Sequence, residues 1–250
     1  AGESGSGKSM TALAIMGLLP KPMCRIAGGS VRLGETELVG LSDAGYRQIR
    51  TARVAMIFQE PMSSLNPVFR VRQQIGEVLA LHRGMDEGQA REETVRLLDM
   101  VGIPSARQRL EQYPHELSGG MKQRVMIAMA LLCEPDVLIA AEPTTALDVT
   151  IQKQVLDLMA ELQERKGMAI LLITHDMGVI AAASDRVAVL YAGRLAELGP
   201  VRDVLTTPAH PHPVRLLAPT PLAYAGKRDP HPDPAAHPRP PDPPRPGHPP

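Results

Sequence analysis

The chain has 250 residues, of which 44% are hydrophobic but only 2% aromatic, so we expect an aliphatic core filled in part by methionine. Lysine and arginine number 27 and are balanced by 27 acidic residues, which argues against a nucleic-acid-binding surface. Two cysteines exclude a disulfide framework, and no apolar run reaches the roughly 18 residues of a membrane span.

The first predicted element is a glycine-rich turn that opens a helix. Its residues match the pattern G-x-x-x-x-G-K-[ST], and they are Gly2, Glu3, Ser4, Gly5, Ser6, Gly7, Lys8 and Ser9. Glycines let backbone N–H groups curl around a polyphosphate, Lys8 adds a positive charge, and the Ser9 hydroxyl can ligate Mg²⁺. Met10 begins a helix predicted over residues 10–19, whose positive end faces the anion. We therefore predict that residues 2–10 bind a nucleoside triphosphate.

A strand should lead into such a loop, and no strand precedes it in this sequence. We expect the chain to lack an amino-terminal segment that contains this strand and the residues that hold the base of the nucleotide.

The middle of the chain changes from a strand pattern to a helix pattern. Alternating residues predict a small antiparallel patch over residues 28–40 and a short buried strand over residues 54–58. Apolar residues at three- and four-residue spacing then predict three helices, over residues 71–81, 87–101 and 120–133.

The last third of the chain alternates between strands and helices. Buried strands are predicted at Val137–Ala141, Ala169–Ile173 and Arg186–Tyr191, and helices at residues 150–165 and 177–183 separate them. This alternation predicts an α/β fold with a parallel sheet. From residue 227 onward proline dominates and large apolar residues are missing, so we expect a disordered tail over residues 227–250.

Further motifs follow the phosphate loop in a fixed order. Leu117, Ser118, Gly119, Gly120, Met121, Lys122 and Gln123 match the pattern L-S-G-G-x-x-Q. Gln59 follows the strand at 54–58, Glu142 follows the apolar run Val137–Ala141, Asp148 ends the triplet Ala-Leu-Asp, and His175 follows Ala169–Ile173. In this combination the chain resembles the nucleotide-binding subunit of ATP-binding cassette (ABC) transporters over about residues 1–217.

The resemblance implies a fold and a division into parts. It implies a P-loop NTPase (RecA-like) fold with a parallel-sheet core, a small antiparallel β patch and an inserted α-helical subdomain. Residues 1–60 and 134–199 would form the nucleotide-binding core, and residues 61–133 the helical subdomain that carries the signature. Residues 200–226 would form a C-terminal extension.

The resemblance also implies a role for each motif. Glu142 would be the general base and His175 a switch that contacts the γ-phosphate. Gln59 would reach Mg²⁺ and couple the nucleotide to the membrane partner. Asp148 would cross a dimer interface, and the Ser118 signature (Leu117, Ser118, Gly119, Gly120 and Gln123) would close on ATP held by a second subunit.

One position departs from the family pattern. Where the family has an aspartate before the general base, this chain has Ala141, and no neighbouring carboxylate replaces it. The absent carboxylate would hold Mg²⁺ directly or through water, so we expect a loss of about 10–100-fold in metal affinity or activity. Nucleotide binding, held mainly by the loop and Lys8, should suffer less.

Within the family the chain is most similar to the oligopeptide and dipeptide importers. Two stretches carry this similarity, residues 59–67 and the segment from residues 113–117 through 142–150. The resemblance implies Mg²⁺ with ATP, a second ATPase subunit (a copy or a paralogue), two membrane permeases and a periplasmic binding protein. It also implies a peripheral location on the cytoplasmic face of the inner membrane. Because no cysteine follows Cys133, we expect no iron–sulfur cluster.

Other interpretations stay open. Ala141 permits a half-site that binds ATP without efficient hydrolysis and acts structurally or by regulation. Nickel importers use closely similar ATPases. A cassette ATPase acting on DNA or the ribosome is disfavoured by the neutral charge and the short helical insert, and the altered C-terminal end permits a non-functional product.

Overall fold

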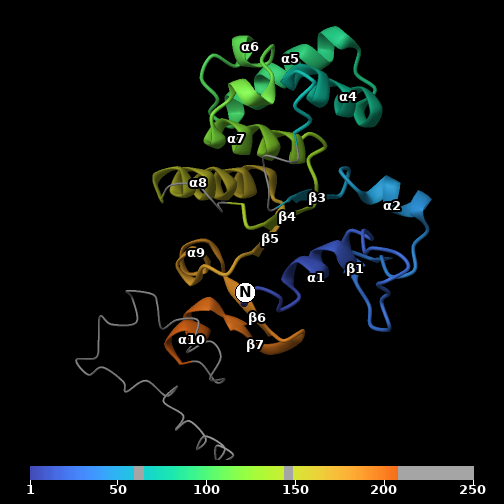
Figure 1. The fold of residues 1–250 in the computed structure, drawn as a ribbon, viewed down its shortest axis with the longest axis vertical. Helices are drawn as coiled ribbons and strands as arrows, with labels where there is room; N and C mark the ends of the chain where they lie inside the picture. Colours follow the sequence, from blue (N-terminus) through green and yellow to red (C-terminus); the bar gives the residue numbers. More distant parts are fainter. Residues whose placement is uncertain (59–64, 144–148, 208–250) are drawn as a thin grey trace, which may run out of the picture.

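The computed structural model describes residues 1–58, 65–143 and 149–207 (Figure 1). In chain order the elements are α1 (Lys8–Ile15), β1 (Arg32–Leu33), β2 (Thr36–Glu37), α2 (Asp43–Ile49), β3 (Val54–Ile57), α4 (Val71–Arg83), α5 (Glu87–Met100), α6 (Ala106–Arg109), a 3₁₀ turn (Pro114–Glu116), α7 (Gly119–Ala130), β4 (Val137–Ala141), α8 (Val149–Lys166), β5 (Ala169–Ile173), α9 (Met177–Ala183), β6 (Arg186–Tyr191), β7 (Arg194–Pro200) and α10 (Val201–Thr206).

A three-stranded parallel sheet occupies the middle of the molecule. Its order is β3-β4-β5, with Val54 opposite Val137 and Val137 opposite Ala169. Successive strand residues point to opposite faces, and both faces are apolar. The strands therefore read as continuous hydrophobic runs, as expected where helices or other elements cover both faces of a parallel sheet.

Two hydrophobic clusters cover the two faces. One joins Ala55, Ile57, Leu138 and Ala140 of the sheet to helices α4, α5, α7 and α8. The other joins Val54, Ile139 and Ile173 to α1, α2 and the β1–β2 hairpin. Figure 1 shows the result, with the helices α4 to α7 at one end of the long axis and α1 beyond the sheet. The predicted parallel sheet and small antiparallel patch are both present.

The prediction for Arg186–Tyr191 is only partly right. The segment is a strand, but β6 pairs with β7 in antiparallel fashion and is not hydrogen-bonded to β5. On its other edge the Ala1 amino group donates to the Ala188 carbonyl at 2.7 Å, and the Leu190 N–H donates to the Ala1 carbonyl at 2.8 Å. The backbone of Ala1 thus lies beside β6 just before the phosphate loop begins.

A third hydrophobic cluster lies near the end of the described chain, between α9 and α10. Side chains of α9, β6 and α10 pack against one another, among them Ile180, Val189 and Val204. The sequence patterns did not predict α2, β7 or α10. Every helix in residues 1–58, 65–143 and 149–207 is too short or too polar for a membrane span.

Candidate functional site

The phosphate loop is shaped by glycines at its two ends. Gly2 has φ of 150°, and a Cβ there would lie 2.3 Å from the Leu190 carbonyl oxygen, so β6 would collide with any side chain. Gly7 has φ of 99° in the left-handed region and precedes the first residue of α1. No side chain caps α1 among the residues described, so the backbone N–H groups at its start are left for another acceptor.

Lys8 is held inside this loop. Its side chain is buried, and Nζ donates to the Gly2 carbonyl at 2.6 Å and to the Glu3 carbonyl at 2.8 Å. The Gly193 N–H donates to the Ser6 carbonyl at 3.2 Å and ties the loop to the β6–β7 turn. The predicted cation therefore sits among the loop carbonyls, where it can exchange these neutral acceptors for phosphate oxygens.

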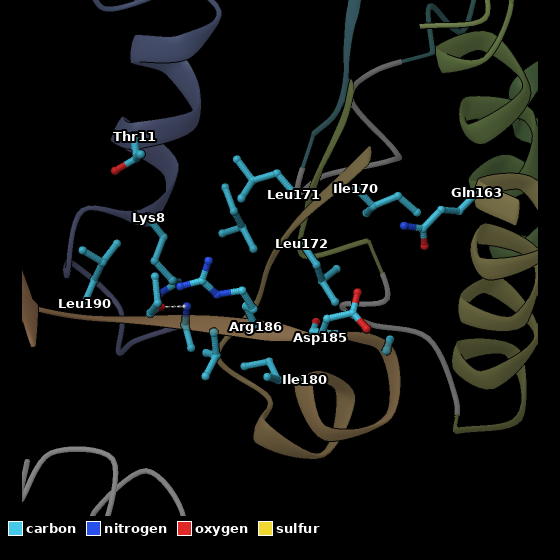
Figure 2. A pocket seen from close by; sticks show the side chains of 16 residues that line it. Lys8, Thr11, Gln163, Ile170, Leu171, Leu172, Ile180, Asp185, Arg186 and Leu190 are labelled. Atoms are coloured by element: carbon cyan, nitrogen blue, oxygen red, sulfur yellow. Dashed lines mark hydrogen bonds between the residues drawn. The ribbon is translucent and has the colours of Figure 1, made fainter. Parts of the chain in front are cut away.

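A cavity of about 380 Å³ lies next to the loop (Figure 2). Lys8 and Thr11 line one part of it, and the rest is formed mostly by apolar side chains of β5 and β6 such as Leu171, Leu172 and Leu190. Residues of both β5 and β6 line this cavity, and the two strands belong to different sheets.

Glu142 and His175 come together where two neighbouring strands end. Glu142 follows β4, His175 follows β5, and His175 Nδ1 lies 3.1 Å from Glu142 Oε1. The Glu142 side chain is 12% exposed and the His175 ring 60%. Glu142 also has φ of 48°, rare for a residue with a side chain, and its N–H donates to the Ile173 carbonyl at 2.7 Å. Such backbone strain clusters at functional sites.

The turn that carries His175 is fixed by the residues on either side of it. The Asp176 N–H donates to Thr174 Oγ1 at 3.0 Å, and Asp176 Oδ1 accepts from the Gly178 N–H at 2.8 Å at the start of α9. Neither Thr174 nor Asp176 was predicted as a site residue. An aspartate directly before a predicted helix is a capping signal that points to Asp176.

Ala141 occupies the last position of β4. It is 3% exposed and pairs with Ile173 in the sheet, so the methyl group lies in the buried position next to Glu142. In the described part of the chain no group of three or more His, Cys, Asp or Glu side chains could hold a metal. The Ser9 hydroxyl, in the first turn of α1, is exposed and can supply an oxygen. These residues fit a Mg²⁺ ion held mainly by nucleotide phosphates and water.

The signature residues form the exposed start of α7. Ser118 is the N-cap, and its Oγ accepts from the Met121 N–H at 3.3 Å. Leu117 is buried, whereas Ser118 and Gly119 are exposed. The loop and the signature lie on opposite faces of the sheet, because α1 packs in one cluster and α7 in the other (Figure 1). A single chain does not bring Lys8 and Ser118 into one site.

Gln123 has a different environment from the rest of the signature. Its side chain is fully buried, and neither amide atom has a hydrogen-bond partner within the described residues. A buried unpaired polar group costs about 1–3 kcal/mol of stability. The side chain lies inside the helical cluster rather than on the surface that Ser118 presents. Gln59 and Asp148 lie outside the described residues.

The sequence is similar to those of known transport proteins. Residues 1–145 match the family model described as ABC transporter. The chain is 51% identical over 220 residues to the dipeptide transport ATP-binding protein DppD of Bacillus subtilis, covering 88% of this chain and 66% of that protein. It is 55% identical over 216 residues to the oligopeptide transport ATP-binding protein OppD of Salmonella typhimurium, covering 86% of this chain and 64% of that protein.

A solved structure is also similar. The dimeric post-hydrolysis state of the ATP-binding cassette MJ0796, bound to ADP and Pi, has a TM-score of 0.69 and 28% identity, covering 80% of this chain and 83% of that one. The chain spans slightly less than two thirds of the length of the first curated relatives. On these matches the chain belongs to the ABC transporter family.

Proposed function

We propose that the chain is the ATP-binding subunit of an importer for dipeptides or oligopeptides and that it hydrolyses ATP to drive uptake. The observation that carries this proposal is the Glu142–His175 pair, 3.1 Å apart, at the ends of strands adjacent to the loop helix α1. Relatives at 51–55% identity are named for dipeptide and oligopeptide transport, which supports the substrate class. The nickel-importer alternative has no comparable support.

The chemistry assigns a task to each group. The loop N–H groups and Lys8 bind the β- and γ-phosphates, and Glu142 accepts a proton from the water that attacks the γ-phosphate. His175 holds the Glu142 carboxylate through their hydrogen bond, and its exposed ring would contact the γ-phosphate. Mg²⁺, held by Ser9 and Gln59, would neutralise charge on the phosphates when bound.

The partners follow from the division of the site. Because α1 and α7 lie on opposite faces of the sheet, the Ser118 end of α7 would complete the ATP site of a second cassette. Two permeases and a periplasmic binding protein would complete the importer, with this chain on the cytoplasmic face of the membrane. Residues 61–133 would be the subdomain that carries the signature, and residues 1–60 and 134–199 the nucleotide-binding core.

Lys8→Met should weaken ATP binding by about 10–100-fold, because a charged hydrogen-bond donor to the phosphates is lost. The matched control is Lys21→Met, which removes an exposed lysine that pairs with Asp43. Binding of a fluorescent ATP analogue to the full chain measures both. Equal affinity in wild type and Lys8→Met would refute the assignment of the phosphate site.

A second function is favoured by one observation. Ala141 leaves a buried, uncharged position where a metal-holding carboxylate is expected. The chain would then bind ATP and dimerise with a second ATPase subunit, and that partner would perform most of the hydrolysis.

A further inference from the structure

Arg124 connects three helices around the signature. It lies in α7, six residues after Ser118, and its guanidinium group reaches in two directions. Nη1 donates to the Val101 carbonyl at the end of α5, at 2.6 Å. Nη2 donates to Gln154 Oε1 on α8, at 3.0 Å. One side chain thus links the signature helix to the helical cluster and to α8.

The end of α5 is shaped to receive this group. Gly102, which follows the C-cap Val101, has φ of 72° in the left-handed region. A Cβ at Gly102 would lie 2.7 Å from Arg124 Nη1, so a larger residue there would require the end of the Arg124 side chain to move. Val101 is fully buried, so its carbonyl relies on a protein donor. Gly102 leaves room for the guanidinium beside the Val101 carbonyl, which accepts the hydrogen bond from Nη1.

The first turns of α7 and α8 also touch directly. A Cβ on Gly120 would lie 3.1 Å from Ile151 Cγ2, a tight contact that a larger residue could make only if Ile151 shifted by a few tenths of an ångström. Ile151 and Met121 pack against the same hydrophobic cluster. Val149, the first residue of α8, is 83% exposed, and Ser118 at the start of α7 is exposed too. Both helix starts therefore face outward from one joined block.

We propose that Arg124 is a positioning residue that holds the start of α7 and the start of α8 in one geometry toward the ATP of the opposing subunit. This inference rests on the proposed function. The two segments assigned to that ATP are the Ser118 signature and Asp148, which directly precedes α8. A planar guanidinium donates to Val101 and Gln154 at the same time, which a lysine ammonium at this position cannot reproduce.

The test compares ATP-dependent association with ATP binding by the single chain. Arg124→Lys keeps the positive charge but loses the two separate N–H groups of the guanidinium. Gln154→Leu removes the acceptor on α8, and because this side chain is exposed the substitution should not unfold the chain. Each variant should weaken ATP-dependent dimerisation of the full chain about tenfold, because it loses a charge-assisted hydrogen bond. Binding of a fluorescent ATP analogue to the monomer should not change, because the Lys8 loop lies on the other face of the sheet.

Two further variants serve as controls. Gln154→Glu keeps an acceptor for Nη2 and should dimerise like wild type. Arg107→Lys makes the same substitution at an exposed arginine that donates twice to Glu92 in the same helical region, and it should have no effect. Sedimentation analysis in the Glu142→Gln background, which slows turnover, measures all variants with ATP present.

The outcomes separate this inference from the proposed function. If the wild-type chain does not dimerise with ATP, a site divided between two copies of this chain is wrong and this inference falls with it. If wild type dimerises and both Gln154→Leu and Arg124→Lys match it, the proposed function stands and the role of Arg124 is refuted. Equal weakening of monomer ATP binding and dimerisation would indicate a general structural role and would also refute it.

Discussion

Ala141→Asp should raise the rate of Mg²⁺-dependent ATP hydrolysis about 10–100-fold, the loss expected when a residue that supports a metal is absent. Ala141 lies at the end of β4, directly before Glu142, and is 3% exposed. Ala141 lies on the same sheet face as Ile139, which packs in the cluster with α1, so a carboxylate there would lie on the α1 side with little competing water and attract Mg²⁺ strongly. Steady-state hydrolysis as a function of Mg²⁺ concentration measures the gain.

The control for this change is Ala141→Asn, which has nearly the same size and no charge. We expect it to give no comparable gain. An aspartate in a nearly buried position is uncompensated when no metal is present, so Ala141→Asp should also lower the melting temperature of the nucleotide-free chain. Addition of Mg²⁺ and ATP should recover that loss. If the hydrolysis rate does not rise, Ala141 is not what limits hydrolysis in this chain.

Glu142→Gln should lower the turnover number about 100–10,000-fold, the usual contribution of a general base. The amide keeps the size of the side chain and can still contact His175 Nδ1, now 3.1 Å from the carboxylate, so the local structure should survive. ATP binding should stay close to that of wild type, because the loop and Lys8 do not depend on Glu142. Single-turnover hydrolysis separates the chemical step from binding.

The matched control for Glu142 is Glu134→Gln, at a carboxylate that forms an exposed ion pair with Lys166 before β4 begins. It should hydrolyse ATP at the wild-type rate. A Glu142→Gln variant that keeps the wild-type turnover number would show that another group accepts the proton, and the reading of the β4 and β5 ends would have to change.

The parallel sheet could be predicted because each strand is a short apolar run, although β5 is partly exposed where β3 and β4 are largely buried. Val54, Ile139 and their neighbours carry that pattern without any contribution from distant residues. The pairing of β6 could not be predicted in the same way. Its partner β7 contains Arg194, Glu197 and Gly199 and is mostly exposed, so it lacks the apolar pattern of a strand. Pairing there depends on backbone contacts that composition does not reveal.

The site, like the fold, has some features that the sequence predicts and others that it does not. Motif spacing predicted the loop and placed Glu142 and His175 after neighbouring strands, and parallel strands necessarily bring such ends together. Spacing could not indicate that Glu142 has positive φ or that Lys8 bonds to the Gly2 and Glu3 carbonyls. It also gave no sign of Arg124, because the two acceptors on Val101 and Gln154 are 23 and 30 residues away in sequence.

Disulfide crosslinking can show whether two copies of the chain share one ATP site. Cys24 and Cys133 are first replaced by serine, and then one chain carries Ser4→Cys in the loop while its partner carries Ser118→Cys. Arg107→Cys in place of Ser118→Cys is the control. We expect rapid crosslinking between loop and signature when ATP is added in the Glu142→Gln background, and little without ATP or with Lys8→Met. Crosslinking no faster than that of the control pair, in chains shown to be saturated with ATP, would mean that the two copies do not share the site.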